Sequence, residues 1–157
     1  LEGLEFLGRA KALSGVPASR AAKAKGASSF LWLEEAMNHF LLGFMFSKTC
    51  RELLGASAFC DDCSARATHH FNHALRLYDA FKSRSASAKD KASAVHFHTA
   101  KHLAWTYEHK TRGDKELELA KRNFMLAIKG LHGNELQQCK RDFEAFLNLA
   151  MSLKKVA

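Results

Sequence analysis

One pattern of small and aromatic residues occurs twice in this chain of 157 residues. An alanine is followed by an aromatic residue and a second alanine at Ala67-x3-Phe71-x2-Ala74 and at Ala120-x3-Phe124-x2-Ala127. Upstream of each copy, a leucine and a small residue precede an aromatic residue, at Leu42-Gly43-x2-Phe46 and Leu103-Ala104-x2-Tyr107. Small residues let two helices approach closely, and an aromatic side chain one turn away fills the space between them. The pattern therefore predicts two antiparallel helical hairpins.

The composition supports an all-α fold. The chain has a single proline, it is rich in Ala, Leu and Lys, and it has few of the β-branched residues that favour strands. We expect roughly five to seven helices in a right-handed array similar to tetratricopeptide repeats. Compared with that 34-residue unit, the first copy has about a dozen extra residues between its half-motifs and the second about four. The predicted hairpins are therefore irregular.

Apolar spacing and capping residues divide the chain into helices. We expect helices at about 4–13, 28–54, 57–81, 87–112, 114–131 and 134–153. The basic stretch at 17–26 is either another short helix or a linker. Ser87, Asp114 and Asn134 are the expected N-caps of the last three helices, because short polar side chains accept hydrogen bonds from the first turn. The helix at 28–54 is apolar on most sides, so we expect it to be central.

The length of the chain suits one helical interaction domain that spans residues 1–157. The chain begins at Leu1-Glu2-Gly3 without Met, so we expect a fragment of a longer protein. Four cysteines are too few for a disulfide scaffold, which favours an intracellular location. The longest apolar run, at 40–46, is far shorter than the roughly 20 residues of a membrane-spanning helix, so we expect a soluble protein without a membrane partner.

A zinc site is considered at Cys60-x2-Cys63, which is followed by His69, His70 and His73. Thiolates and imidazoles at short spacing are typical zinc ligands. One continuous helix, however, spreads these side chains over two turns, or about 11 Å of rise, while zinc bonds are about 2.0–2.3 Å long. We therefore expect packed thiols and no metal.

Catalytic chemistry finds no support in the sequence. No Ser, Cys or His stands on a glycine-rich elbow beside an oxyanion hole. The adjacent acids Glu34-Glu35 and Asp61-Asp62 point to different sides of a helix, and His98 with His102 lacks a third ligand. We expect a protein that is not an enzyme, with no catalytic residue, no cofactor and no small-molecule substrate.

The net charge of +8 favours contact with RNA, DNA or an acidic partner. No recognised nucleic-acid motif accompanies the basic residues, so solvated helix faces are the alternative interpretation. The candidate contact residues are Arg20, Lys23, Lys25, Lys82, Arg84, Lys110 and Arg112.

The last helix has apolar residues on more than one narrow stripe. Apolar surface at the end of a helical array has to be covered, and a second copy of the chain is one way to cover it. The alternative is that the helix packs into a groove of its own array. The candidate dimer interface consists of Phe143, Phe146, Leu147, Leu149, Ala150 and Leu153.

The order of the helices resembles the C-terminal homology domain of the ALF family, which are scaffolds of transcription elongation. The segments that carry the resemblance are Phe6-Leu7-x2-Ala10-Lys11-x-Leu13, Leu31-x-Leu33-x-Glu35-Ala36-x3-Phe40-x2-Gly43, Ala74-Leu75-Arg76-Leu77, Asp90-Lys91 and Leu103-Ala104-x2-Tyr107. The resemblance implies a nuclear, tetratricopeptide-like domain that forms homodimers or heterodimers, largely through its C-terminal helices.

These observations lead to three hypotheses about function. The first is a scaffold and dimerisation domain of a transcription elongation regulator. The second is a monomeric module of tetratricopeptide or microtubule-interacting-and-transport type, which holds a partner peptide in a groove between hairpins. The third is a basic domain whose main task is nucleic-acid binding.

Overall fold

The computed structural model describes residues 27–53, 58–81 and 85–156. These residues form α3 (Ala27–Leu53), α4 (Ala58–Phe81), α5 (Ala86–Thr106), α6 (Asp114–Gly130) and α7 (Gly133–Val156), and a π-helical turn, η1 (Tyr107–Thr111), continues α5. No strand occurs in these ranges, which confirms the predicted all-α class. The helix predicted at 4–13 and the stretch at 17–26 lie outside the described residues. The tetratricopeptide-like arrangement stays a prediction.

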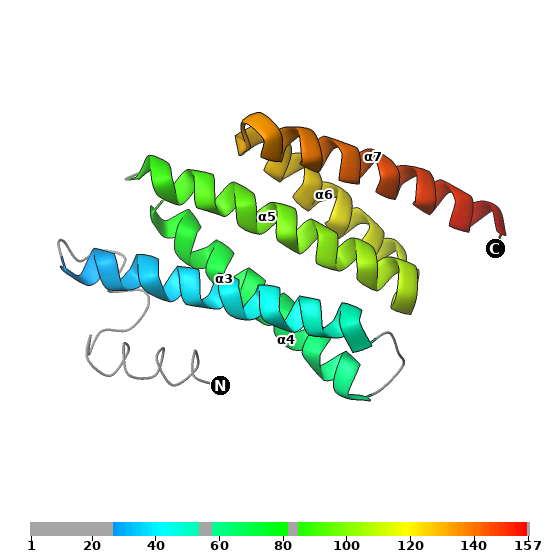
Figure 1. Cartoon of the computed structure of the whole chain (residues 1–157), viewed down its shortest axis with the longest axis horizontal. Helices are drawn as coiled ribbons and strands as arrows, with labels where there is room; N and C mark the ends of the chain where they lie inside the picture. Colours follow the sequence, from blue (N-terminus) through cyan, green and yellow to red (C-terminus); the bar gives the residue numbers. More distant parts are fainter. Residues whose placement is uncertain (1–26, 54–57, 82–84, 157) are drawn as a thin grey trace.

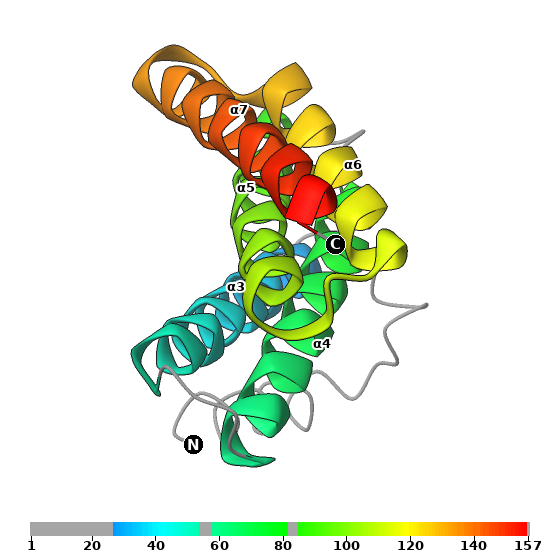
Figure 2. The same cartoon turned by 90° about the vertical axis from the view of Figure 1, so that its right-hand side faces the viewer.

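The helices pack in the order in which they follow one another along the chain (Figures 1 and 2). The hairpin of α3 and α4 contacts the hairpin of α5 and α6, mainly through α4 and α5, and α7 lies on α6 and α5. None of the described helices combines the length and apolar character needed to cross a bilayer.

The first hairpin is held at close range by the small residues of the repeated pattern. Ala67, Phe71 and Ala74 are buried, and Phe71 lies against the backbone of Gly43. A Cβ atom placed on Gly43 would lie only 2.7 Å from the Cδ1 atom of Phe71. The predicted role of Gly43, a small residue that lets the two helices approach, is therefore confirmed.

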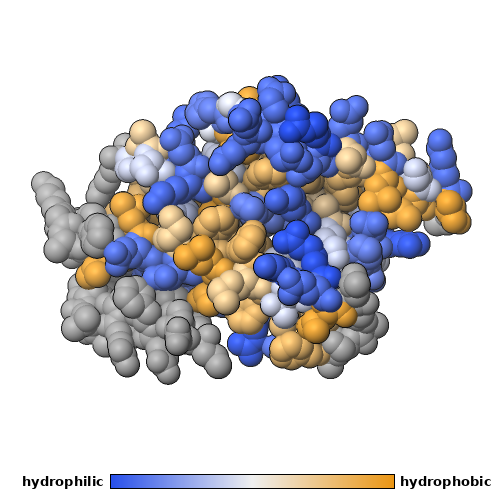
Figure 3. Space-filling view, viewed as in Figure 1, coloured by the Kyte–Doolittle hydropathy of each residue, from blue (hydrophilic) through white to orange (hydrophobic). Residues whose placement is uncertain are grey.

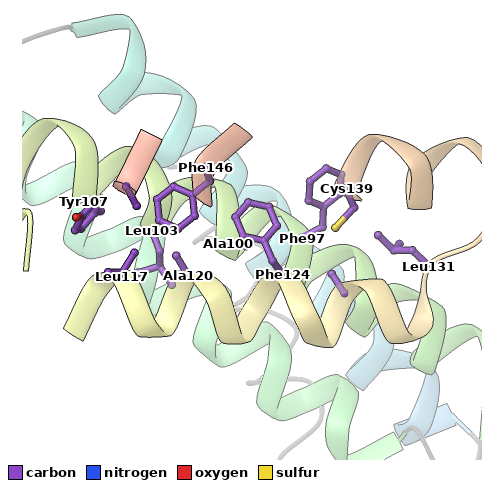
Figure 4. Packing of buried hydrophobic residues seen from close by; sticks show 12 residues of the cluster. Phe97, Ala100, Leu103, Tyr107, Leu117, Ala120, Phe124, Leu131, Cys139 and Phe146 are labelled. Atoms are coloured by element: carbon purple, nitrogen blue, oxygen red, sulfur yellow. The ribbon is translucent and has the colours of Figure 1, made fainter. Parts of the chain in front are cut away.

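The second copy of the pattern builds the other half of the core. Ala120, Phe124 and Ala127 of α6 are buried. The ring of Phe124, which belongs to α6, lies between α5 and α7. It is stacked on Phe143 at 5.0 Å and tilted against Phe146 at 5.9 Å between ring centroids. Figure 4 shows Phe124 and Phe146 facing each other in this cluster. The aromatic residue of the pattern thus joins three helices.

Three predicted helix starts are corrected by the structure. The N-cap of α5 is Ser85, whose hydroxyl accepts a hydrogen bond from the backbone of Ala88 at 3.3 Å, so Ser87 lies inside the first turn. Gly113 takes the N-cap position of α6, which makes Asp114 its first residue. Asn134 lies within α7, because that helix begins at Gly133.

The connection between α5 and α6 includes a feature that the sequence does not predict. The last turn widens to the π-helical η1, and Arg112 then takes a left-handed conformation with φ of 47°. The backbone N–H of Arg112 donates to the carbonyl of Tyr107 at 3.1 Å. This turn directs the chain back from α5 into α6.

Candidate functional site

Within the described residues, α3 lies at one end of the array and packs mainly on α4 (Figure 2). Its predicted central position stays a prediction, because the segments expected before it lie outside the described residues. Three large apolar residues of α3 are exposed, and one of them, Phe44, also lies edge-on to His98 of α5 at 5.3 Å between centroids. Leu41, Phe44 and Met45 are 48%, 36% and 61% exposed. Residues spaced by three and four positions share one face of a helix. Figure 3 shows hydrophobic side chains gathered over the middle of α3.

This apolar stripe is bounded by opposite charges. Glu34 and Lys48 lie seven positions before and after Leu41, which places both on the stripe after two turns. Met37 belongs to the same side, since all these side chains lie within about 60° of Leu41 around the axis of a regular helix. Between Glu35 and Lys48 there is no Asp, Glu, Lys or Arg. We call the residues Glu34, Met37, Leu41, Phe44, Met45 and Lys48 the α3 stripe.

The inner side of α3 carries a buried polar cluster. Glu35 and His39, one turn apart, are 8% and 5% exposed and face His70 and His73 of α4. The Nδ1 atoms of His39 and His70 are 2.8 Å apart, so one donates a hydrogen bond to the other. Burial lowers the pKa of His70 to about 4. His70 is therefore neutral near pH 7.

A second buried histidine links three helices. His102 of α5 has its Nδ1 atom 2.9 Å from the hydroxyl of Ser47, and its Nε2 atom lies 3.3 Å from the carbonyl oxygen of Ser64. The Ser64 hydroxyl oxygen lies 3.2 Å from the same Nε2 atom. Because a carbonyl only accepts, its contact is satisfied when the proton is on Nε2, and the Ser47 hydroxyl then donates to Nδ1. Burial lowers the pKa of His102 to about 4, which keeps this neutral form.

The cysteines of the zinc hypothesis lie in a different cluster from the histidines. Cys60 and Cys63 pack with Cys50, and the thiols of Cys50 and Cys60 each donate to the other residue's carbonyl. Burial raises the pKa of Cys50 to about 12. Cys63 and His70 are two turns apart on α4, about 10 Å along the helix axis.

The candidate dimer residues of the last helix serve the core of their own chain. Phe146 and Ala150 are each 4% exposed, and Phe143 and Leu153 are partly buried against the same cluster. Leu147 and Leu149 are half-buried. The large apolar residues that α7 exposes are instead Met151 and Val156. Phe146 and Ala150 can contact a second copy only if this core opens. Their burial corresponds to the alternative interpretation, in which the last helix packs into its own array.

Most of the candidate basic residues lie outside the described residues, namely Arg20, Lys23, Lys25, Lys82 and Arg84. Of the other two, Lys110 forms an ion pair with Asp61 of α4, and Arg112 is exposed after η1. These two residues flank the start of the α5–α6 turn. They form no extended basic surface by themselves.

Two features of the candidate site are not predicted from the sequence. The Glu35 and His39 pair belongs to α3, and its partner His73 comes from α4, so the cluster becomes visible only when the two helices pack. The α3 stripe has a signal in the sequence, the spacing Glu34-x6-Leu41-x6-Lys48, but the apolar residues on the other sides of the same helix obscure it.

Comparison of the chain with protein-family models, with curated proteins and with solved structures found no match.

Proposed function

We propose that this chain is a non-enzymatic helical interaction domain that self-associates through the α3 stripe. The observation that carries the proposal is the exposed apolar row on α3, which contains Leu41 and Met45 and ends in Glu34 on one side and Lys48 on the other. Contiguous exposed apolar surface favours association. In this proposal the dimer interface is the α3 stripe and no longer the last helix.

The charges at the ends of the stripe indicate a second copy as the partner. In an antiparallel contact with Leu41 on the two-fold axis, position 34 of one copy lies opposite position 48 of the other, since their numbers are symmetric about 41. Glu34 then meets Lys48 of the second copy, and the pair occurs twice. Met37 and Met45 face each other in the same way. A surface that is complementary to itself is what a two-fold dimer requires.

The wider role that we propose is a scaffold in transcription elongation, in the nucleus. Its support is the resemblance described above, which includes Glu35-Ala36, Phe40 and Gly43 of α3 and Ala74-Leu75-Arg76-Leu77 of α4. Within that family resemblance, dimerisation is the expected activity of the domain.

Light scattering on the purified chain over a range of micromolar concentrations tests the proposal. We expect the mass of a dimer that falls toward the monomer on dilution. The double variant Leu41→Lys/Met45→Lys should be a monomer with unchanged helical circular dichroism, because both side chains are exposed. Met151→Lys is the matched control, since Met151 is 59% exposed on α7 and Met45 61% on α3.

Two results would overturn the proposal. One is a wild-type chain that stays a monomer at every concentration. The other is a dimer that Met151→Lys dissociates and the α3 variant does not, which would return the interface to the last helix.

A further inference from the structure

Three potential metal ligands meet between α3 and α4, at a place that the proposed function does not use. Glu35 and His39 project from one side of α3, and His73 projects from α4 toward them. One carboxylate oxygen and one nitrogen from each imidazole all lie within 4.8 Å of one another. Glu35 and His39 are buried, and His73 is half-buried.

The distances within this group are close to those between ligands that share one metal ion. The Oε1 atom of Glu35 is 3.9 Å from Nε2 of His39 and 3.8 Å from Nε2 of His73. A charge-assisted hydrogen bond between such groups would be about 2.7–2.9 Å long. Ligands that surround a tetrahedral zinc ion at about 2.0–2.2 Å are about 3.4 Å apart. The three ligand atoms lie within 4.8 Å of one another, so a separation would have to shorten by at most about 1.4 Å for all three to surround one zinc ion.

The neighbour His70 holds His39 in the orientation that ligation needs. When Nε2 of an imidazole binds a metal, its proton is on Nδ1, and this N–H usually donates to a second residue that fixes the ring. Nδ1 of His39 is 2.8 Å from Nδ1 of His70. At this distance Nδ1 of His70 can accept that hydrogen bond when the proton of the His70 ring is on Nε2.

We propose that Glu35, His39 and His73 bind a divalent metal ion of the zinc class. Two imidazole nitrogens and one carboxylate oxygen form a ligand set that zinc accepts, and water completes the tetrahedron on the half-exposed side of His73. The ion ties α3 to α4 and thus supports the helix that carries the α3 stripe. This site uses no cysteine, in contrast to the zinc site considered from the sequence.

The test begins with the full chain, stripped of metal by a chelator and titrated with Zn²⁺ by calorimetry. We expect one ion per chain and a higher midpoint of thermal unfolding, because a ligand of the folded state stabilises it. Glu35→Gln and His73→Ala should each weaken Zn²⁺ binding by more than about 100-fold, and His70→Ala by about 10–100-fold, the range for residues that orient a ligand. His132→Ala, at an exposed histidine before α7, should bind as the wild type does.

Cobalt(II) as a second probe keeps the test decisive if a variant fails to fold. In the wild type, Co²⁺ at this site should give the visible bands of tetrahedral coordination without the near-ultraviolet charge-transfer band of a thiolate ligand. A thiolate band would assign the metal to the cysteines and overturn the proposal. So would the absence of Zn²⁺ binding, or equal binding by the Glu35→Gln, His73→Ala and His132→Ala variants.

Discussion

At the scale of single residues, the first hairpin depends on the missing side chain of Gly43. Replacing a helical glycine by alanine normally stabilises a helix by up to about 1 kcal/mol. Here the new Cβ atom would meet the ring of Phe71 at 2.7 Å. We therefore predict that Gly43→Ala lowers the free energy of unfolding by about 1–3 kcal/mol, as overpacking does. Urea unfolding monitored by circular dichroism measures this change.

A double-mutant cycle is the control for Gly43. In a Phe71→Leu background the ring is absent, so adding the methyl group of Gly43→Ala should cost less or even stabilise. The same loss of stability in both backgrounds would show that Phe71 does not set the limit on the approach of α3 and α4.

His102 makes the stability of the protein depend on pH. Its pKa is lowered to about 4 in the folded chain, against about 6.5 in an unfolded chain. Above pH 6.5 the group is neutral in both states and has no effect. Below that value the unfolded state takes up the proton first, so the free energy of unfolding falls by up to about 1.4 kcal/mol per pH unit until about pH 4.

Urea unfolding at several pH values tests this prediction. His102→Gln should have a smaller slope between pH 6.5 and 4 than the wild type, while His132→Ala, which removes an exposed histidine, should keep the full slope. Equal slopes in all three proteins would exclude His102 as a source of the pH dependence.

At the scale of the element, α3 has two sides with opposite roles. The stripe on its outer side predicts that Glu34→Lys and Lys48→Glu each weaken self-association, because each puts like charges opposite each other in the antiparallel contact. The double variant restores opposite charges and should recover most of the wild-type dimer. Sedimentation equilibrium measures the three dissociation constants. If the double variant instead loses as much dimer affinity as the two single variants together, the antiparallel pairing is contradicted.

For α7, the structure predicts a loss of stability when Phe146 is truncated. Phe146 contacts Tyr107 and Phe124 within the core. Truncation of a buried phenylalanine costs about 3–5 kcal/mol, so Phe146→Ala should greatly lower the unfolding midpoint. Met151→Ala on the same helix should change the free energy of unfolding by less than about 0.5 kcal/mol, as exposed positions do, and should leave the midpoint nearly unchanged. Thermal unfolding distinguishes the two, and equal midpoints would contradict the packing of α7.

The bounds of the helices show which parts of the fold local sequence patterns predict. The helices expected at 28–54 and 57–81 are found at Ala27–Leu53 and Ala58–Phe81, because their apolar spacing is long and their ends are marked by small polar residues or Gly55. Ser85 and Ser87 are the same residue type two positions apart, so residue type alone does not decide between them, and the structure places the N-cap at Ser85. The π-helical turn η1 likewise has no capping residue that would predict it, since Thr106 makes no side-chain cap hydrogen bond.

At the scale of the whole molecule, the sequence reveals helices more readily than their neighbours. Apolar residues on most sides of a helix normally indicate a central position. Within the described residues α3 is at one end. Its buried residues include the apolar Trp32, Ala36 and Leu42 and the polar Glu35, His39 and Ser47, while Leu41 and Met45 are exposed. Which apolar residues of α3 stay exposed, and the meeting of His73 with Glu35, depend on packing between helices, so the spacing within one segment does not decide them.

The most direct test is to cross-link variants that carry one added cysteine across the proposed α3 contact. The native cysteines interfere little, because Cys50, Cys60, Cys63 and Cys139 are buried, and thiols with raised pKa react slowly. Burial raises the pKa of Cys50 to about 12 and that of Cys139 to about 11. An added exposed cysteine is therefore the main reactive thiol.

Leu41→Cys is compared with Met151→Cys and Met125→Cys, which place the thiol on α7 and α6. With a short bismaleimide, we predict a cross-linked dimer for Leu41→Cys alone, because residue 41 of each copy lies at the two-fold axis of the proposed contact. A dimer through Met151→Cys without one through Leu41→Cys, or no dimer in any variant, would contradict it.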